Sequence, residues 1–160
     1  MTNGAKGPTT VRVATIDDVA AMSRVLIASI RELCVADHEN DPERLASWTA
    51  NKTPAGIRAS LTTPGTRFFV AERDGEIAAV GCVGETGAIL LNYVEPSHRF
   101  QGVSKALLDE MEAVLRRWGI AKAYLDCTVT AHRFYLTAGW VDTYGPHDGE
   151  VWNYSMHKVL

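Results

Sequence analysis

The sequence has few cysteines, no long apolar run and no excess of positive charge. The three cysteines, Cys34, Cys82 and Cys127, are odd in number and lack the spacing of a metal-binding set. They favour reduced thiols in a cytoplasmic protein, because extracellular frameworks usually pair their cysteines. No apolar run is long enough to cross a bilayer, so we expect no membrane partner. The formal charge of −3 argues against nucleic acid as a partner, since a nucleic-acid binder normally has a basic face.

The chain also lacks internal repeats, and its length bounds the number of domains. With 160 residues, 46% of them hydrophobic, we expect one domain that covers residues 11–160. Residues 1–10 are rich in Gly and Thr and have no apolar core. They are therefore expected to form a flexible N-terminal tail rather than a signal peptide.

Hydrophobic periodicity and turn residues predict helices first, then a strand meander, then a strand–helix–strand crossover and a final strand pair. Asp74-Gly75 is a strong hairpin turn, Thr130 is expected to cap a short helix, and Gly139 is expected to close it. This order predicts an α+β fold with a mixed, mostly antiparallel central sheet flanked by helices. The expected strands are Val11–Ala14, Arg67–Arg73, Glu76–Val83, Ala88–Val94, Lys122–Cys127, Trp140–Tyr144 and Val151–His157, and the expected helices are Thr15–Ala36, two that begin at Asp41 and Thr53, Gly102–Trp118 and Thr130–Ala138.

The segment Leu91–Leu108 is the most informative part of the sequence. It runs from an apolar strand through a polar turn into an amphipathic helix whose first turn holds Gly102 and Ser104. A helix start exposes unpaired N–H groups and the positive end of the helix dipole, and small residues let an anion approach the backbone. Arg99 and Lys105 add positive charge at its edges. The segment therefore predicts a phosphate-binding turn.

Two other phosphate motifs do not fit this segment. A dinucleotide fingerprint needs three glycines and a later acidic residue, and a P-loop needs a Gly-Lys-Ser/Thr ending. Neither pattern is present around Gly102. A helix start that merely contains a Gly and a Ser stays open as the simpler reading of this segment taken alone.

Two motifs together resemble the GCN5-related N-acetyltransferase (GNAT) family. Arg99-x-x-Gly102-x-Ser104 is similar to its coenzyme A signature Q/R-x-x-G-x-G/A, with Ser104 in place of Gly or Ala. Ala131 to Trp140 is similar to its later A-x-x-F-Y helix that ends at Gly-aromatic. The motifs occur in the family order, and the resemblance extends over roughly residues 67–140. It implies the acetyltransferase fold, with an acetyl-CoA-binding strand–loop–helix.

The resemblance also assigns site residues. It implies that the strand before the turn is splayed from its neighbour, and that the N–H of Val94 polarises the thioester. Tyr135 stands at the tyrosine position of the family, and a phenol with a pKa of about 10 suits protonation of the departing thiolate. A half-buried Tyr that only packs the helix stays the alternative. The residues expected to bind the cosubstrate are Asn92, Tyr93, Val94, Arg99, Phe100, Gln101, Gly102, Val103, Ser104, Lys105, Thr128, Phe134 and Tyr135.

The sequence offers several candidates for the group that deprotonates the amine. Relatives often have a Glu or His on the strand that enters the phosphate turn, but Ala88, Leu90 and Asn92 hold neither. Glu32 on the first long helix is the slightly preferred candidate, and a solvated surface charge is its alternative. The other candidates are Glu85 and His38.

The acidic stretch Asp37–Asp41 is not expected to bind a metal, because consecutive ligands do not converge on one ion without a special loop. Trp48, Tyr93 and Trp152 are residues that shape either the acceptor site or the core. Cys127 would need a nearby His and a lowered pKa to act as a nucleophile, so a buried structural cysteine is the expected role.

The resemblance thus predicts an acetyl-CoA-dependent N-acetyltransferase that acts by direct transfer in a ternary complex, without a metal. Its partners would be acetyl-CoA and an unidentified amine, and a homodimer is left open. Two alternatives remain: a CoA-binding sensor or interaction module without transferase activity, and an acyl-CoA hydrolase that uses Cys127.

Overall fold

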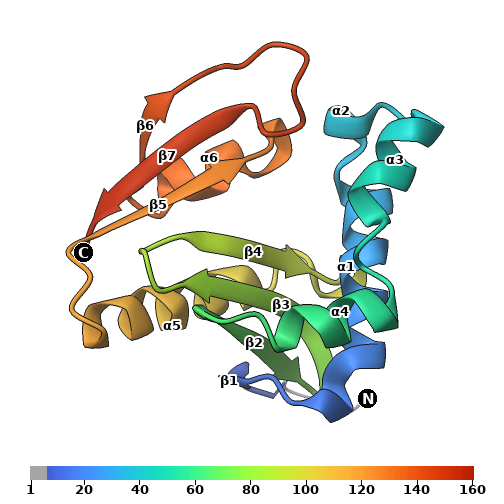
Figure 1. The fold of residues 1–160 in the computed structure, drawn as a ribbon, viewed down its shortest axis with the longest axis vertical. Coiled ribbons are helices and arrows are strands. Elements are labelled where there is room, and N and C mark those ends of the chain that lie inside the picture. Colours follow the sequence, from blue (N-terminus) through green and yellow to red (C-terminus); the bar gives the residue numbers. More distant parts are fainter. Residues whose placement is uncertain (1–6) are drawn as a thin grey trace, which may run out of the picture.

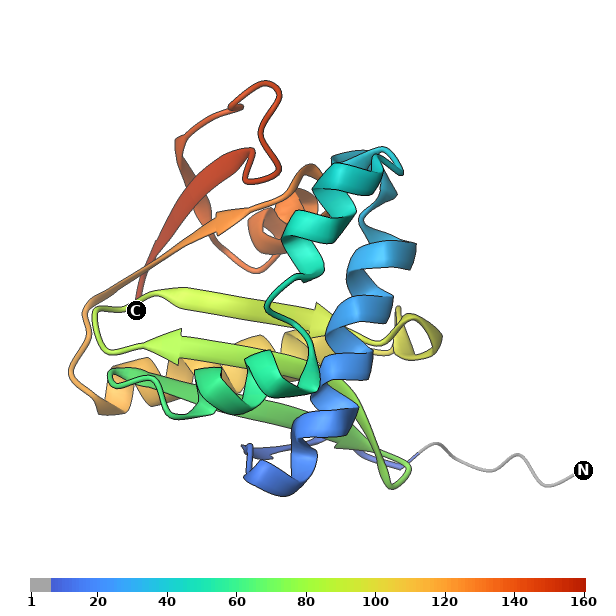
Figure 2. The ribbon, with the colours of Figure 1, turned by 45° about the vertical axis from the view of Figure 1, so that its right-hand side comes forward.

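The computed structural model describes residues 7–160 (Figures 1 and 2). The predicted tail therefore lies largely outside the described residues, and Thr10 already pairs with Glu72. The strands are β1 (Thr10–Val13), β2 (Thr66–Arg73), β3 (Glu76–Gly84), β4 (Ile89–Val94), β5 (Lys122–Cys127), β6 (Val141–Tyr144) and β7 (Tyr154–Val159). The helices are η1 (Ile16–Asp18), α1 (Val19–Leu33), α2 (Val35–His38), α3 (Pro42–Thr49), α4 (Pro54–Leu61), η2 (Pro96–His98), α5 (Val103–Arg117) and α6 (Val129–Thr137).

The first sheet is antiparallel, in the order β1-β2-β3-β4, and helices cover both of its faces (Figure 2). Successive residues of a strand point to opposite faces, and β3 is apolar on both. Val80 and Cys82 pack with α1 and α4, whereas Ala79 and Val83 pack with α5. Gly81 lets α5 come close, because a Cβ there would lie 2.7 Å from the sulfur of Met111. The packing of β3 against α5 fixes the position of α5 on this face of the sheet.

The second sheet, in the order β5-β7-β6, is also antiparallel and is splayed away from the first (Figure 1). The two sheets meet at one parallel bridge, between Ala88 and Tyr124, where the amide of Tyr124 donates to the carbonyl of Gly87 (3.1 Å). Beyond this point β4 and β5 are not paired. The α+β class with antiparallel sheets is confirmed, and its central sheet is divided in two.

A β-bulge lies in β4 just after the bridge. Leu91 stands opposite Cys82 while Ile89 stands opposite Val83, so Leu90 is the extra residue. A bulge bends its strand and increases the local twist. The irregularity lies where β4 leaves β5, and it leaves the side chain of Leu90 exposed.

The first long helix is shorter than predicted. We expected it to run to Ala36, but α1 ends at Leu33 and α2 follows as a separate turn. The break is stabilised by buried polar groups: the carbonyl of Ile30 accepts from the amide of Cys34 and lies 3.0 Å from Nε2 of His38. The contact between His38 and Ile30 joins residues that a continuous helix would place too far apart.

The cap of α6 also differs from the prediction. Thr128, not Thr130, caps the helix, and its hydroxyl accepts from the amide of Ala131 (3.2 Å). The hydroxyl of Thr130 instead donates to the carboxylate of Asp37. Several other local predictions are confirmed: Asp41 and Thr53 cap α3 and α4, Asp74-Gly75 forms the hairpin, and Gly139 has positive φ. Within residues 7–160, no helix has the length and apolar character that crossing a membrane requires.

Candidate active site

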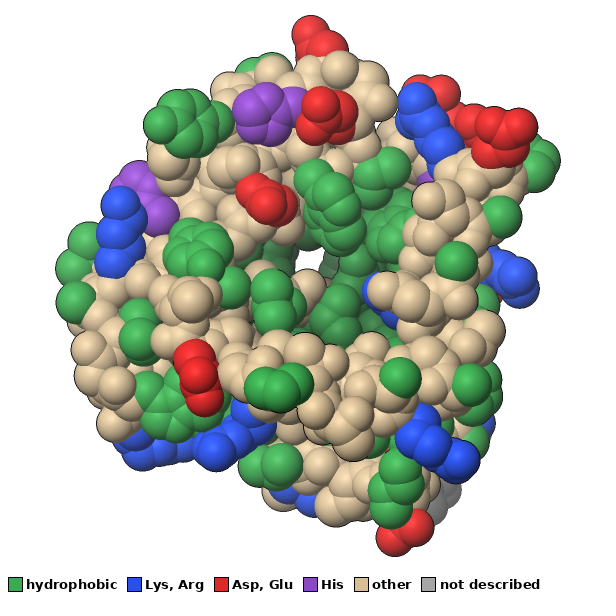
Figure 3. All heavy atoms as spheres, viewed as in Figure 1, with side chains coloured by type: hydrophobic (Ala, Val, Ile, Leu, Met, Phe, Trp, Pro, Cys, Tyr) green, Lys and Arg blue, Asp and Glu red, His purple; other side chains and the backbone are tan. Residues whose placement is uncertain are grey.

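A cleft of about 520 Å³ lies in the split between the two sheets. Its walls come from α1, β4, the turn before α5, the end of β5 and α6. Figure 3 shows the hollow between the sheets, bordered by hydrophobic side chains. The unpaired edges of β4 and β5 therefore face a space rather than each other.

The turn at one end of the cleft has the geometry of an anion site. Phe100 and Gly102 both have left-handed backbone conformations, with φ of 63° and 76°. The first intrahelical bond of α5 runs from the amide of Ala106 to the carbonyl of Gly102 (3.0 Å), so the amides of residues 103–105 precede it. Such free amides at the positive end of a helix dipole bind anions. Gly102, Val103 and Ser104 line the cleft.

Side chains that the sequence did not point to hold this turn in place. The Glu95 carboxylate accepts from the amide of Ser97 (3.0 Å) and lies 3.0 Å from Nδ1 of His98. Burial opposes ionisation of Glu95, but these hydrogen bonds outweigh it and lower the pKa of the carboxyl. Arg73 donates to the carbonyl of Gln101 (3.1 Å). His98 is buried and lines the cleft.

The two cations of the turn are within the cleft wall. The guanidinium of Arg99 lies over the ring of Phe100, 4.6 Å from its centre. Lys105 pairs with Asp109 one turn further along α5. Both side chains are long and anchored by surface contacts, which an incoming phosphate group could replace.

The backbone of β4 directs an amide into the split. The amide of Glu95 donates to the carbonyl of Ala78 (2.7 Å), and Val94 stands opposite Ala79. In an antiparallel ladder this pattern makes Val94 and Ala79 a non-hydrogen-bonded pair, whose own backbone groups point away from each other. The N–H of Val94 therefore points toward the free edge of β4.

Tyr135 lies in the opposite wall, on α6. Its ring packs edge-on against Phe134 and Trp140, with ring centres 5.0 and 5.8 Å away, and the residue is 5% exposed. Burial raises the pKa of the Tyr135 hydroxyl, and the nearby side chain of Asn92 partly opposes the rise. The Oδ1 atom of Asn92 is itself buried, without a hydrogen-bond partner in the described part of the chain. Because its pKa is raised, the hydroxyl of Tyr135 keeps its proton at neutral pH.

The start of α6 is fixed by a carboxylate from α2, which is distant in sequence but adjacent in space. Asp37 on α2 is 6% exposed, accepts from the amide of Val129 (2.8 Å) and also binds the hydroxyl of Thr130. A negative charge is favourable at a helix N-terminus. Asp37 therefore positions the wall that carries Thr128 and Tyr135.

The structure brings most of the predicted cosubstrate residues to the cleft. Gln101 is an exception, because its amide folds back toward the carbonyl of Ser97 (3.4 Å) and does not line the space. The predicted residues that do line it are Asn92, Tyr93, Val94, Arg99, Phe100, Gly102, Val103, Ser104, Lys105, Thr128, Phe134 and Tyr135.

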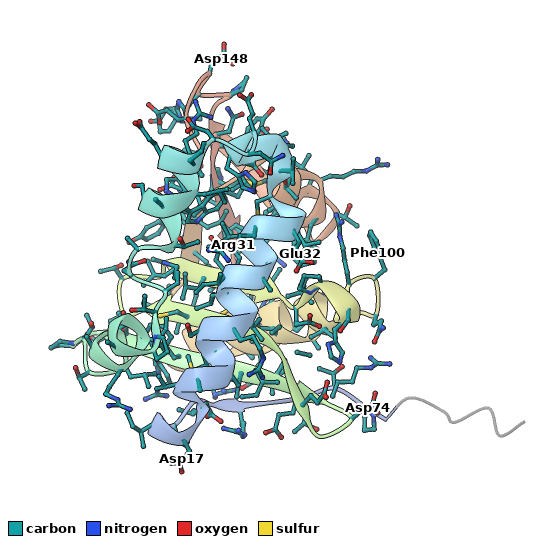
Figure 4. The ribbon with its side chains drawn as sticks, turned by 90° about the vertical axis from the view of Figure 1, so that its right-hand side faces the viewer. Asp17, Arg31, Glu32, Asp74, Phe100 and Asp148 are labelled. Atoms are coloured by element: carbon teal, nitrogen blue, oxygen red, sulfur yellow. The ribbon has the colours of Figure 1, made fainter. Side chains whose placement is uncertain are left out.

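The three predicted proton acceptors do not line the cleft. Glu32 is exposed on the surface of α1, as Figure 4 shows. His38 is fully buried: its Nδ1 accepts from the amide of Asn40 (2.9 Å), which leaves Nε2 to donate to the carbonyl of Ile30. Glu85 lies in the exposed turn between β3 and β4. None of the three is placed to contact a ligand in the split.

All three cysteines are buried and without a disulfide, and the burial of Cys127 was expected from the sequence. Burial raises the pKa of the Cys127 thiol to about 12, so its thiolate is scarce at neutral pH. The thiol lies 3.6 Å from the sulfur of Met156. Among residues 7–160 we find no cluster of His, Cys, Asp and Glu able to hold a metal ion.

Asp126 and Trp152 are among the cleft residues that lay outside the sequence prediction or had no definite role in it. Asp126 lies near the end of β5 and Trp152 in the loop before β7, and both line the cleft. Alternation along β5, in which Ala123, Leu125 and Cys127 are buried, would have placed Asp126 on the outer face. No local pattern marks Trp152.

An anion-binding turn, a directed amide and a buried tyrosine along one cleft suit an enzyme that transfers a group from a long, phosphate-bearing donor. Comparisons with known proteins agree with this class. Residues 23–153 match the family model of the acetyltransferase (GNAT) domain. The chain therefore belongs to the GNAT acetyltransferase family, and the resemblance seen in the two motifs is confirmed.

Solved structures share the fold over nearly the whole chain. A GCN5-related N-acetyltransferase from Rhodopseudomonas palustris matches with a TM-score of 0.83 and 23% identity, over 98% of each chain. The PaiA N-acetyltransferase from Thermoplasma acidophilum, solved in complex with coenzyme A, matches with a TM-score of 0.75 and 17% identity, over 96% of this chain and 100% of that one. Among curated proteins, an IAA acetyltransferase from Azospirillum brasilense is 27% identical over 111 residues, which are 63% of this chain and 72% of that protein.

Proposed function

We propose that the protein transfers an acetyl group from acetyl-CoA to the nitrogen of an amine, directly and with both substrates bound. The observation that carries this proposal is the split between β4 and β5, which brings Val94, Tyr135 and the Gly102 turn to one cleft. Membership of the GNAT family supports acetyl transfer, and the PaiA structure with coenzyme A supports CoA as the carrier.

The donor would lie along the cleft with its phosphates at the turn. The amides of Val103, Ser104 and Lys105 would bind the pyrophosphate, with Arg99 and the Lys105 side chain adding charge. The pantetheine arm would run between the β4 segment 92–94 and Thr128 on the other wall. Thr128 has a hydroxyl proton to donate, because its oxygen serves as the acceptor in the α6 cap.

The transfer step then uses one group from each wall. The amine nitrogen gives its electron pair to the thioester carbonyl carbon, a C–N bond forms, and the C–S bond breaks. The N–H of Val94 stabilises the negative charge that develops on the carbonyl oxygen. The hydroxyl of Tyr135 gives its proton to the departing sulfur and regains one from solvent. The amine releases its proton to water.

Water is named as the proton acceptor because the predicted bases lie outside the cleft lining. Glu32 keeps a role only if it acts through a water chain from the helix surface. A Glu32→Gln enzyme with an unaltered pH profile would leave solvent as the base. A loss of activity at neutral pH with recovery at alkaline pH would restore Glu32.

A cytoplasmic setting is part of the proposal. It is supported by the three free, buried thiols, a state that a reducing compartment maintains.

The proposal is tested by incubating the protein with acetyl-CoA and a panel of amines, with free thiol and acetylated amine both measured. Equal amounts of the two products are expected. Binding of CoA without release of thiol would instead identify a sensor module. Thiol release without an acceptor would identify hydrolysis.

A further inference from the structure

The main cleft continues into a second hollow on the outer side of the split. This hollow, of about 150 Å³, shares Ile89, Leu90, Asp126 and Trp152 with the main cleft. The phosphate turn does not line it. A donor bound at the turn would therefore leave this hollow to the second substrate.

The walls of the second hollow are largely apolar and uncovered. Leu90, Tyr124 and Trp152 line it, and each is between 43% and 48% exposed. The ring of Trp152 is held edge-on by Trp48, with ring centres 5.6 Å apart. An enclosed apolar cavity of about 150 Å³ holds one benzene ring, so this open hollow of similar volume has room for one ring. The hollow thus fits an aromatic or compact apolar group.

The charges of the cleft are separated along its length. Arg99 and Lys105 lie at the phosphate turn, and Arg133 on α6 also lines the main cleft, whereas no Lys or Arg of the described chain lines the second hollow. Asp126 is the one Asp or Glu among the described residues that line either hollow. Its carboxylate accepts from the hydroxyl of Ser155 (2.7 Å), and it has no salt-bridge partner within residues 7–160. The carboxylate retains lone pairs for a cation.

We propose that the acceptor is a primary amine on an aromatic or compact apolar body, bound with its ammonium at Asp126. The body would lie against Leu90, Tyr124 and Trp152. This inference rests on the proposed function and adds the substrate class to it. Asp126 would repel an acceptor that has its own carboxylate beside the amine, so free amino acids would be poor substrates.

Three amines test this class: 2-phenylethylamine, L-phenylalanine, which adds a carboxylate to the same skeleton, and ethanolamine, which lacks the ring. We expect kcat/KM for 2-phenylethylamine to exceed both others at least about tenfold, because burial of the ring and an unopposed ammonium both favour it. A preference for ethanolamine or for L-phenylalanine would overturn the inference while leaving acetyl transfer intact.

Variants locate the two parts of the site. Asp126→Asn should raise the KM for 2-phenylethylamine about fivefold and shrink its advantage over L-phenylalanine. Trp152→Ala should lower kcat/KM for 2-phenylethylamine but not for ethanolamine. Asp17→Asn is the matched control, since Asp17 is exposed at the far end of the molecule (Figure 4). An unchanged substrate preference in Asp126→Asn would contradict the assignment.

Calorimetry provides a readout that needs no turnover. The wild-type protein is first saturated with CoA, which carries no acetyl group. The inference expects 2-phenylethylamine to bind this complex more tightly than L-phenylalanine does. If no amine is acetylated yet this preference is found, the proposed function fails and the acceptor site stands. If neither amine binds, the acceptor site fails.

Discussion

Tyr135 combines burial in the core with a place in the cleft wall. Replacing it with Phe keeps the ring packing against Phe134 and Trp140 and removes only the hydroxyl. We expect turnover to fall about a hundredfold, the usual size of a general-acid contribution, with little change in CoA affinity. Single-turnover kinetics on acetyl-CoA measure the step directly. Wild-type chemistry in the variant would rule out Tyr135 as the acid.

The direction of the Tyr135 pKa shift gives the pH dependence. Burial favours the neutral phenol and raises the pKa, so the hydroxyl keeps its proton to a higher pH than an ordinary tyrosine does. Loss of activity through ionisation of Tyr135 should therefore begin only above about pH 10. A rise in activity from neutral pH toward the pKa of the amine would reflect deprotonation of the substrate.

Gly102 carries a prediction with a matched control elsewhere in the chain. Gly102 and Gly75 have φ of 76° and 77°, and a Cβ at either position would meet no atom within 4 Å. A Val at each position pays similar backbone strain, on the order of 1–2 kcal/mol. Only the Val at Gly102 would stand at the phosphate turn, so CoA affinity should fall in Gly102→Val and stay normal in Gly75→Val. Equal affinities by calorimetry would contradict a phosphate site at this turn.

Some of these residues could be predicted from sequence and others could not. Gly102 and Tyr135 belong to short motifs, in which a local pattern fixes the geometry. Asp126 and Trp152 meet only because β5 and the loop before β7 come together in space. Glu32 was predicted as the proton acceptor because it lies in the helix region near the acceptor site. Its position on the helix places its side chain on the exposed surface.

Among elements, α2 and α6 are joined by Asp37. Asp37→Ala removes two hydrogen bonds to a charged group and should cost about 2 kcal/mol of unfolding free energy. Because α6 carries Tyr135, turnover should fall as well. Asp41→Ala removes a partly exposed cap of α3 in the same region, so it should cost about 1 kcal/mol of unfolding free energy and leave turnover normal. Urea unfolding and steady-state rates compare the two, and equal effects on turnover would contradict the positioning role.

Most element bounds followed from hydrophobic period and caps, and β5 was predicted to the residue. The break between α1 and α2 at Cys34 could not be predicted in this way. It depends on the contact of His38 with Ile30 and on the hydrogen bond of Asp37 with α6. The same element pairing corrects the prediction for Thr130: a threonine oxygen can accept from a backbone N–H at a helix start, but the hydroxyl of Thr130 instead donates to Asp37, and Thr128 caps α6.

At the scale of the whole molecule, two sheets share one core and separate at the candidate active site. The largest buried cluster includes Ala79 of β3, Leu108 of α5, Leu125 of β5 and Met156 of β7. On this basis we propose that residues 11–160 form one domain. The division of the sheet was implied by family resemblance alone, since no sequence pattern in β4 or β5 marks the bulge at Leu90 or the end of their pairing.

The central claim is that the split between β4 and β5 holds the thioester of acetyl-CoA. A crystal structure with a non-reactive acetyl-CoA analogue tests it most directly. The account predicts the pyrophosphate at the amides of Val103–Lys105 and the carbonyl oxygen of the analogue about 3 Å from the nitrogen of Val94. An analogue bound outside the split, or one whose carbonyl oxygen has no contact with Val94, would contradict it.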